Sequence, residues 1–263
     1  MRVYLTAVRL SLRRYLAYRS SALAGSLTNT VFGCLRAFVL IALWKQKTEI
    51  AGWDQSEAVT YAFLTQGLLT PMGVFMANTE LGPRIRSGDV AVDLYRPVDF
   101  QAWWFSLDLG RALGAVLLRS GFPVLLGMLL FPVRLPADPL RWAEFAACCV
   151  LGYLVSFALR YVVSLVAFWT MDERGMSSIL VAAGMFCSGL IVPLTIIPGA
   201  FGAVVRHTPW AAVVQMPVNV LLGTQSGGFG YALAFGCLWS LLLLGGGRLL
   251  TAAARRKVVV QGG

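Results

Sequence analysis

Six long apolar segments constrain this sequence more than any other feature. A helix needs about 20 apolar residues to cross ~30 Å of hydrocarbon at 1.5 Å per residue. The segments that approach or exceed this length are residues 21–44, 58–77, 103–131, 142–171, 177–192 and 229–254. Only 13% of the residues are charged, about half the usual fraction in a soluble domain. The sequence therefore predicts an all-α polytopic membrane protein with six transmembrane helices in a single domain, residues 1–263.

The formal net charge of +10 is compatible with two kinds of protein. A basic protein can bind nucleic acid through arginines clustered on a soluble face. In a membrane protein, the same positive charge holds the cytoplasmic segments on their side of the bilayer. With 58% hydrophobic residues, the second interpretation is favoured, so the lipid bilayer is the expected partner and nucleic acid is not.

Two polar segments lie outside the apolar ones. Residues 78–102 contain three arginines and four acidic residues, too many charges to lie in hydrocarbon. They must occupy water between the second and third spans. Residues 1–20 interleave five arginines with apolar side chains, which predicts an amphipathic helix at the membrane interface. No short apolar region with a cleavage site follows, so this segment is not a signal peptide.

The distribution of lysine and arginine predicts the orientation. With the N-terminus inside, the cytoplasmic segments are residues 1–20, 78–102, 171–176 and 255–263, which carry five, three, one and three basic residues. The segments on the other side carry five in all. Twelve against five favours an N-in, C-in arrangement, with residues 78–102 in the cytoplasm.

Residues 193–228 form a second irregular region. They are too apolar for an ordinary loop, and four prolines interrupt them; each proline would break a transmembrane helix. We expect two short helices, near residues 199–207 and 210–222, that are re-entrant in the outer leaflet or cap the spans. The alternative is a seventh span.

Several polar side chains lie within the predicted spans: Arg36, Gln66, Arg119 and Arg160. Each arginine costs roughly 2.5–3.5 kcal/mol at the centre of a membrane helix. The three arginines have no evident acidic partner in the spans. They either line a path for an anionic or amphiphilic substrate, or they serve helix packing through hydrogen bonds to carbonyl groups. Asp108 and Arg111, three residues apart at the inner start of the third span, are expected to form a local helix contact.

The sequence contains no recognisable motif for phosphate binding, metal binding or catalysis. The sequence lacks the G-x-x-x-x-G-K-[ST] phosphate loop, so it does not bind ATP by that route. It also lacks H-E-x-x-H, G-x-S-x-G and a Cys-x-x-Cys pair. We therefore expect no catalytic residues, no metal and no cofactor on this chain, which would not be an enzyme.

The segment IRSGDVAVDLYRPVD, residues 85–99, resembles a motif of the permease subunits of ABC-2 type transporters. The resemblance is closest to the branch of about 260 residues that accompanies a separate drug-resistance-type ATPase. The basic N-terminus, the six spans with both ends inside and the Pro-broken segment before the last span agree with it. Glycine at position 88 permits a tight bend, and Pro97 stops a helix before the third span.

The resemblance implies a membrane-spanning permease of an ABC exporter in the bacterial cytoplasmic membrane. Two permease chains, copies or homologues, would form the pathway, and a dimer of ATPase subunits would bind ATP and Mg²⁺. A short coupling helix in residues 78–102 would fit a groove on the ATPase. The coupling residues implied are Arg84, Arg86, Gly88, Asp89, Asp93, Leu94, Arg96 and Pro97. The alternatives are a stand-alone secondary carrier or a membrane scaffold without an ATPase partner.

Overall fold

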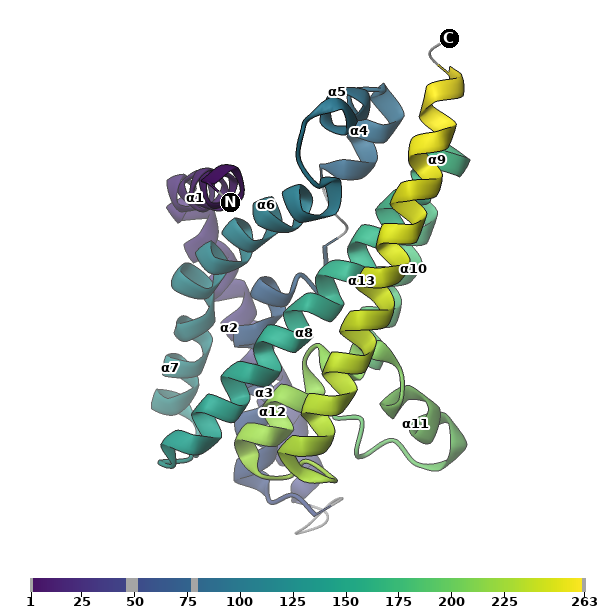
Figure 1. Ribbon diagram of the computed structural model, residues 1–263. Helices are drawn as coiled ribbons and strands as arrows, with labels where there is room; N and C mark the ends of the chain where they lie inside the picture. Colours follow the sequence, from purple (N-terminus) through teal and green to yellow (C-terminus); the bar gives the residue numbers. More distant parts are fainter. Residues whose placement is uncertain (1, 46–51, 77–79, 262–263) are drawn as a thin grey trace.

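The computed structural model describes residues 2–45, 52–76 and 80–261 (Figure 1). The described residues form helices and turns, without β-strands. In chain order, the elements are α1 (Arg2–Ala17), α2 (Arg19–Trp44), α3 (Gln55–Met72), α4 (Leu81–Ser87), α5 (Val90–Tyr95), α6 (Phe100–Ala115), the π-helical turn η1 (Val116–Ser120), α7 (Gly121–Leu130), α8 (Pro139–Leu165), α9 (Ala167–Thr170), α10 (Arg174–Cys187), α11 (Gly199–Arg206), the 3₁₀ turn η2 (Pro209–Ala212), α12 (Gln215–Leu222) and α13 (Gly228–Gln261).

Four helices in the described residues are long and apolar enough to cross a membrane. They are α2, the continuous helix Phe100–Leu130, the helix Pro139–Thr170 and α13 through Arg256. The protein is therefore a multi-pass helical membrane protein. The prediction of six full-length spans is not confirmed, because the second and fifth expected spans correspond to shorter helices, α3 and α10.

Helix α3 is shorter and more polar than predicted. It begins at a capping box in which Asp54 accepts from the Glu57 amide, and it ends at Gly73, whose φ of 64° is left-handed. The end expected at Ala77 lies outside the described residues. Polar residues such as Thr60 and Gln66 lower the mean hydropathy of α3, but most of the helix is buried against its neighbours. It does not need an apolar surface toward lipid.

Helix α10 covers 14 residues and ends at Cys187, not at Val192 as predicted. Gly189 follows with a φ of 81°. A left-handed residue cannot continue a right-handed helix, so the chain turns back into the bundle. Leu194 is fully buried there.

The four segments predicted to be cytoplasmic gather at one end of the molecule, where both termini also lie (Figure 1). Arg14 forms a 2.6 Å ion pair with Glu80, and the Asp99 amide donates to the Tyr4 hydroxyl over 2.9 Å. Ala254, near the C-terminus, packs in the same apolar cluster as Leu81. The segments predicted to be on the other side share the opposite end, which agrees with the two-sided assignment of loops.

Residues 193–228 contain the two expected short helices, α11 and α12, with η2 between them. Each helix has eight residues, which span about 12 Å, so the alternative of a seventh span is wrong. Val218 and Leu221 of α12 are fully buried in a cluster with Tyr61 of α3. This segment covers the end of the bundle opposite the two termini.

Helix α1 lies across the end of the bundle that carries both termini, packed along α6 (Figure 1). The Ser11 hydroxyl donates to the Leu107 carbonyl over 2.6 Å. A side chain at Gly110 would lie 2.4 Å from the Val8 carbonyl oxygen, so only glycine allows this close approach. Leu5 and Leu10 of α1 are exposed beside Arg9 and Arg13, a mixture of apolar and basic side chains expected of a helix at a membrane interface.

Candidate functional site

The segment resembling a coupling loop folds into a pair of short helices, α4 and α5, beyond the end of the bundle. Gly88 ends α4 with a φ of 82°, which confirms the predicted bend. Arg96 is extended with a ψ of 139°, as favoured before a proline, and Pro97 separates α5 from α6. The Asp99 carboxylate then accepts from the Ala102 amide at 2.7 Å and caps α6.

A buried aspartate joins the two short helices. Asp93 is only 3% exposed. Arg84 Nε donates to its Oδ2 over 2.8 Å, and Arg96 Nη1 lies 3.5 Å from its Oδ1. The Arg96 guanidinium also lies 5.0 Å from the ring centre of Trp103. Asp93, Arg84 and Arg96, the α5 cluster, thus tie α4, α5 and the start of α6 together.

The outer surface of α5 carries large side chains that face water. Val92 is 59% exposed and Tyr95 is 87% exposed, although Val90 in the same helix is buried. Leu94 is half-buried against the apolar cluster beneath. Of the other residues implied in coupling, the exposed ones are Gly88, Asp89, Arg96 and Pro97.

The helix pair also contacts the second short loop at this end of the bundle. Arg86 lies 3.9 Å from Asp172, and a side chain at Gly82 would lie 2.2 Å from the Glu173 carboxylate. The pair therefore packs against the turn between α9 and α10, and α4 also contacts α8 and α9.

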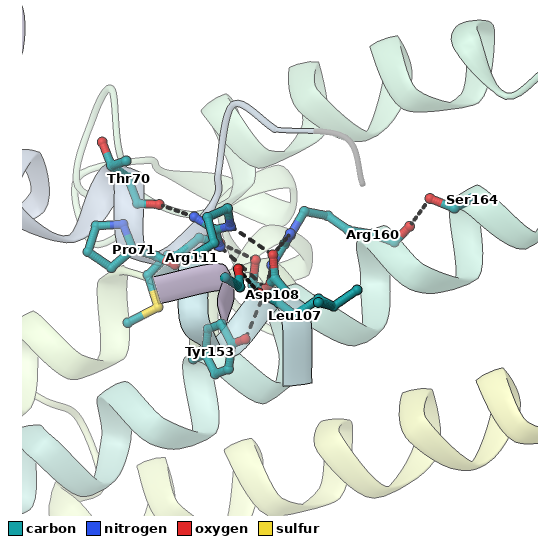
Figure 2. A network of polar contacts seen from close by, with 11 residues as sticks. Thr70, Pro71, Leu107, Asp108, Arg111, Tyr153, Arg160 and Ser164 are labelled. Atoms are coloured by element: carbon teal, nitrogen blue, oxygen red, sulfur yellow. Dashed lines mark hydrogen bonds and ion pairs between the residues drawn. The ribbon is translucent and has the colours of Figure 1, made fainter. Parts of the chain in front are cut away.

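A second polar cluster lies inside the bundle (Figure 2). Asp108 of α6 receives two hydrogen bonds from Arg160 of α8, 2.9 Å to Oδ1 and 2.7 Å to Oδ2. Arg111 donates to Oδ1 over 2.8 Å, and the Tyr153 hydroxyl donates to Oδ2 over 2.9 Å. We call these four residues the Asp108 network. A bidentate guanidinium–carboxylate pair fixes both distance and orientation, so the network sets how α6 lies against α8.

The Asp108 network also holds the end of α3. The last carbonyl groups of a helix have no partner within the helix. Arg111 donates to the carbonyls of Thr70 and Pro71 over 3.0 and 3.2 Å, and the Ser156 hydroxyl donates to the Met72 carbonyl. A cation at a helix C-terminus also complements the helix dipole. Three helices from distant parts of the sequence therefore meet at one buried carboxylate.

The remaining polar residues of the spans serve different contacts. Arg36 Nη1 donates to the Thr65 hydroxyl over 2.7 Å, which joins α2 to α3. Gln66 is 4% exposed within α3 and lies beside Gly33 of α2. Arg119, in η1, lies against Gly25 of α2 and lines a cavity discussed below. The structure does not bring these side chains together with Arg160.

Two sequence predictions about charge need correction. Arg160 has an acidic partner in the spans, because the fold places Asp108 of α6 beside α8. The Asp108–Arg111 contact exists, but it is only part of a network across three helices. Sequence reasoning missed Tyr153 and Ser156, which are ordinary side chains within an apolar run. One signal was available: an acid in one span and an arginine in another are expected to pair in a bilayer.

The fold is that of a multi-pass helical membrane protein. The Asp108 network lies inside its bundle, and the α5 cluster lies in the helix pair α4–α5, at the end that carries both termini. A family described as ABC-2 family transporter protein matches residues 31–259, which is most of the chain. The protein belongs to this family, and the predicted resemblance is confirmed. A comparison with curated proteins found no match.

Proposed function

We propose that this chain is the membrane-spanning subunit of an ATP-driven exporter and that it docks a separate ATPase through α4–α5. Membership of the ABC-2 family makes it a transport component of the membrane. The docking role is supported by one observation above all, the exposed side chains of Val92 and Tyr95 on α5. Large apolar and aromatic side chains that face water beside a rigid support are typical of contact surfaces.

In this proposal, residues of the segment 84–96 take two roles, and Val92 and Tyr95 are added to the coupling residues that the resemblance implied. Asp93, Arg84 and Arg96 fold the helix pair, since Asp93 is buried and engaged by both arginines. Val92, Tyr95 and Asp89 contact the ATPase. ATP and Mg²⁺ bind to the partner, and closure of the partner moves α4–α5 and then the bundle.

The proposed topology has six crossings with both ends in the cytoplasm. Helix α3 has 18 residues and would reach about 27 Å, enough for a crossing that other helices cover. Helix α10 would cross together with residues 188–194. A second permease chain would complete the pathway against apolar surface such as Leu27, Val31 and Phe38 of α2, each more than half exposed.

Site-specific cross-linking tests the docking surface. A photoreactive amino acid replaces Tyr95 in the full chain, expressed with its neighbouring genes in membranes. We expect a covalent adduct with a protein that carries the G-x-x-x-x-G-K-[ST] phosphate loop. The matched control is Phe201 of α11, which is also strongly exposed, at 67%, but lies at the opposite end of the molecule.

A disruptive variant complements the cross-link. Val92→Asp should abolish copurification of the ATPase without loss of the chain from the membrane, because a charge replaces an exposed apolar contact. Phe201→Asp should leave copurification unchanged. Docking through α4–α5 fails if Tyr95 yields no ATPase adduct and Val92→Asp retains the partner. A carrier or scaffold becomes the better account if no ATPase copurifies with the unaltered chain.

A further inference from the structure

A cavity of about 450 Å³ lies where α1 meets the bundle. Its walls come from α1, the first turn of α2, α6 and η1, which lie at one corner of the molecule (Figure 1), and from Met76 and Glu80 between α3 and α4. Small-molecule sites in proteins usually measure roughly 300–1,000 Å³. Because α1 has the pattern of an interfacial helix, this cavity lies at the depth of lipid headgroups.

The charges around the cavity do not cancel. Arg14 at its rim is paired with Glu80. The wall also contains Asp108 and Arg111, but the single carboxylate of Asp108 is shared between Arg111 and Arg160. Arg119 adds a further positive charge. The described walls thus have an excess of positive charge.

Arg119 is the least satisfied of these groups. Its Nε is buried and has no hydrogen-bond partner among the described residues. It belongs to the π-helical turn η1, and such turns often mark functional sites. A side chain at Gly25 would lie 1.4 Å from Nη2 of Arg119, so the guanidinium occupies the space that this glycine leaves. A buried donor without an acceptor is costly, and an anion in the cavity would supply one.

Apart from Ser11 and Ser21, the rest of the lining is aromatic and apolar. Tyr15, Tyr18 and Trp104 line the cavity together with Leu107. Tyrosine and tryptophan favour the boundary between hydrocarbon and water. Beyond the cavity, α2 exposes Leu23, next to which an acyl chain can lie. The lining therefore suits a molecule with an anionic group at one end and a hydrocarbon tail at the other.

We propose that this cavity binds the phosphate-bearing headgroup of a membrane amphiphile, with Arg119 as the principal ligand. The phosphate accepts hydrogen bonds from Arg119, and the tail leaves along α2. The site belongs to this chain alone and does not depend on an ATPase partner. Its failure and the failure of docking through α4–α5 are therefore separate outcomes.

Binding by the purified full chain in a neutral detergent tests the proposal. The probes are short-chain phosphatidylglycerol, short-chain phosphatidylcholine and glycerol 3-phosphate, and thermophoresis gives each dissociation constant. Phosphatidylglycerol should bind tighter than phosphatidylcholine, because only the former has net negative charge. Arg119→Gln should weaken phosphatidylglycerol binding about tenfold, as expected for one charged hydrogen-bonding group. Arg36→Gln, a change of the same type outside the cavity, should leave binding unchanged.

A second variant pair does not depend on removing a buried arginine. Ser21 lines the cavity, and Ser20 is its exposed neighbour in the same first turn of α2. A glutamate is favourable in the first turn of a helix, so both variants should fold. Ser21→Glu places a negative charge in the wall and should weaken phosphatidylglycerol binding severalfold. Ser20→Glu should not, because Ser20 does not line the cavity.

The outcomes separate the sources of the phosphate and decide the proposal. Phosphatidylglycerol binding that far exceeds glycerol 3-phosphate binding supports a lipid, because the tail contributes. Equal binding of the two probes overturns the amphiphile and leaves a site for a free phosphate. Equal effects of Ser20→Glu and Ser21→Glu, or unchanged binding in Arg119→Gln, overturn the cavity as the site.

Discussion

The Asp108 network and the α5 cluster use the same residue types in two different surroundings. In each, one buried aspartate binds an arginine three residues later and a second arginine from another helix. In the Asp108 network the arginine side chains are 15% and 4% exposed. In the α5 cluster they are 37% and 40% exposed.

This difference in exposure decides what each cluster contributes. Arg160 cannot reach water, so its charge depends on Asp108 for compensation, and loss of one partner strands the other. Arg84 and Arg96 can turn toward solvent if Asp93 is lost, so the energetic effect is smaller. The Asp108 network, which lies inside the bundle, therefore holds the helices of the bundle together. The α5 cluster, which lies outside it, shapes a local element that a partner can contact.

Removal of the inner carboxylate should have the largest effect. Asp108→Ala leaves the Arg160 guanidinium buried and unpaired and frees the end of α3 from Arg111. We expect the free energy of unfolding to fall by about 3–5 kcal/mol, measured by denaturation of the purified chain in mixed micelles. Asp89→Ala, a matched change at an exposed aspartate, should cost less than about 0.5 kcal/mol. Equal losses in the two variants would contradict a special role for Asp108.

Replacement of both inner partners should be milder than removal of one. In Asp108→Leu with Arg160→Met, no charge of this pair remains buried, and apolar side chains of similar length fill the space. Buried ion pairs are often replaced in this way with little loss, so we expect a deficit of about 1–2 kcal/mol, because Tyr153 and Arg111 lose an acceptor. A double-mutant cycle measures the coupling. A strictly additive double variant would mean that the two side chains do not stabilise each other.

The α5 cluster illustrates what the sequence could predict. The polar composition of residues 78–102, the Gly88 bend and the stop at Pro97 are local features, and the sequence contained their causes. The burial of Asp93 is not local, because it requires α4 to fold back on α5 and bring Arg84 within reach. For that reason, sequence reasoning placed Asp93 at an interface, whereas the fold places it inside the helix pair.

The Asp108 network was harder to predict, because its contacts join residues that are distant in sequence. The length of an apolar run is enough to identify a membrane-spanning helix that faces lipid. This was sufficient for α2, α6–α7, α8 and α13. Helix α3 is buried among other helices, so its polar residues carry no lipid signal, and its length was misjudged. Arg160 was taken as unpaired because Asp108 lies 52 residues away in sequence, a contact that only the packing of α6 against α8 creates.

Loss of the outer carboxylate should affect coupling more than stability. Asp93→Ala removes the acceptor shared by Arg84 and Arg96, but both arginines reach solvent, so we expect a loss of about 1 kcal/mol. Hydrogen exchange should increase within residues 81–95, and little elsewhere. Under the proposed function, copurification of the ATPase should decrease while the chain stays in the membrane. An unfolding loss as large as that of Asp108→Ala would show that the two clusters do not differ as described.

The smallest effect on unfolding of the bundle should come from the turn that sets the angle between α4 and α5. Gly88→Ala introduces no clash, since nothing lies within 4 Å of the added Cβ, but a φ of 82° costs an alanine about 1–2 kcal/mol. Because α4–α5 folds as a local element, we expect this cost as faster hydrogen exchange of the helix pair, with the unfolding of the bundle unchanged. Gly175→Ala is the matched control, because Gly175 lies in α10 at the same end, also in open space, and a helical alanine is stabilising by up to about 1 kcal/mol. If Gly88→Ala slowed exchange of α4–α5 as Gly175→Ala should for α10, the left-handed turn would not be what orients α5.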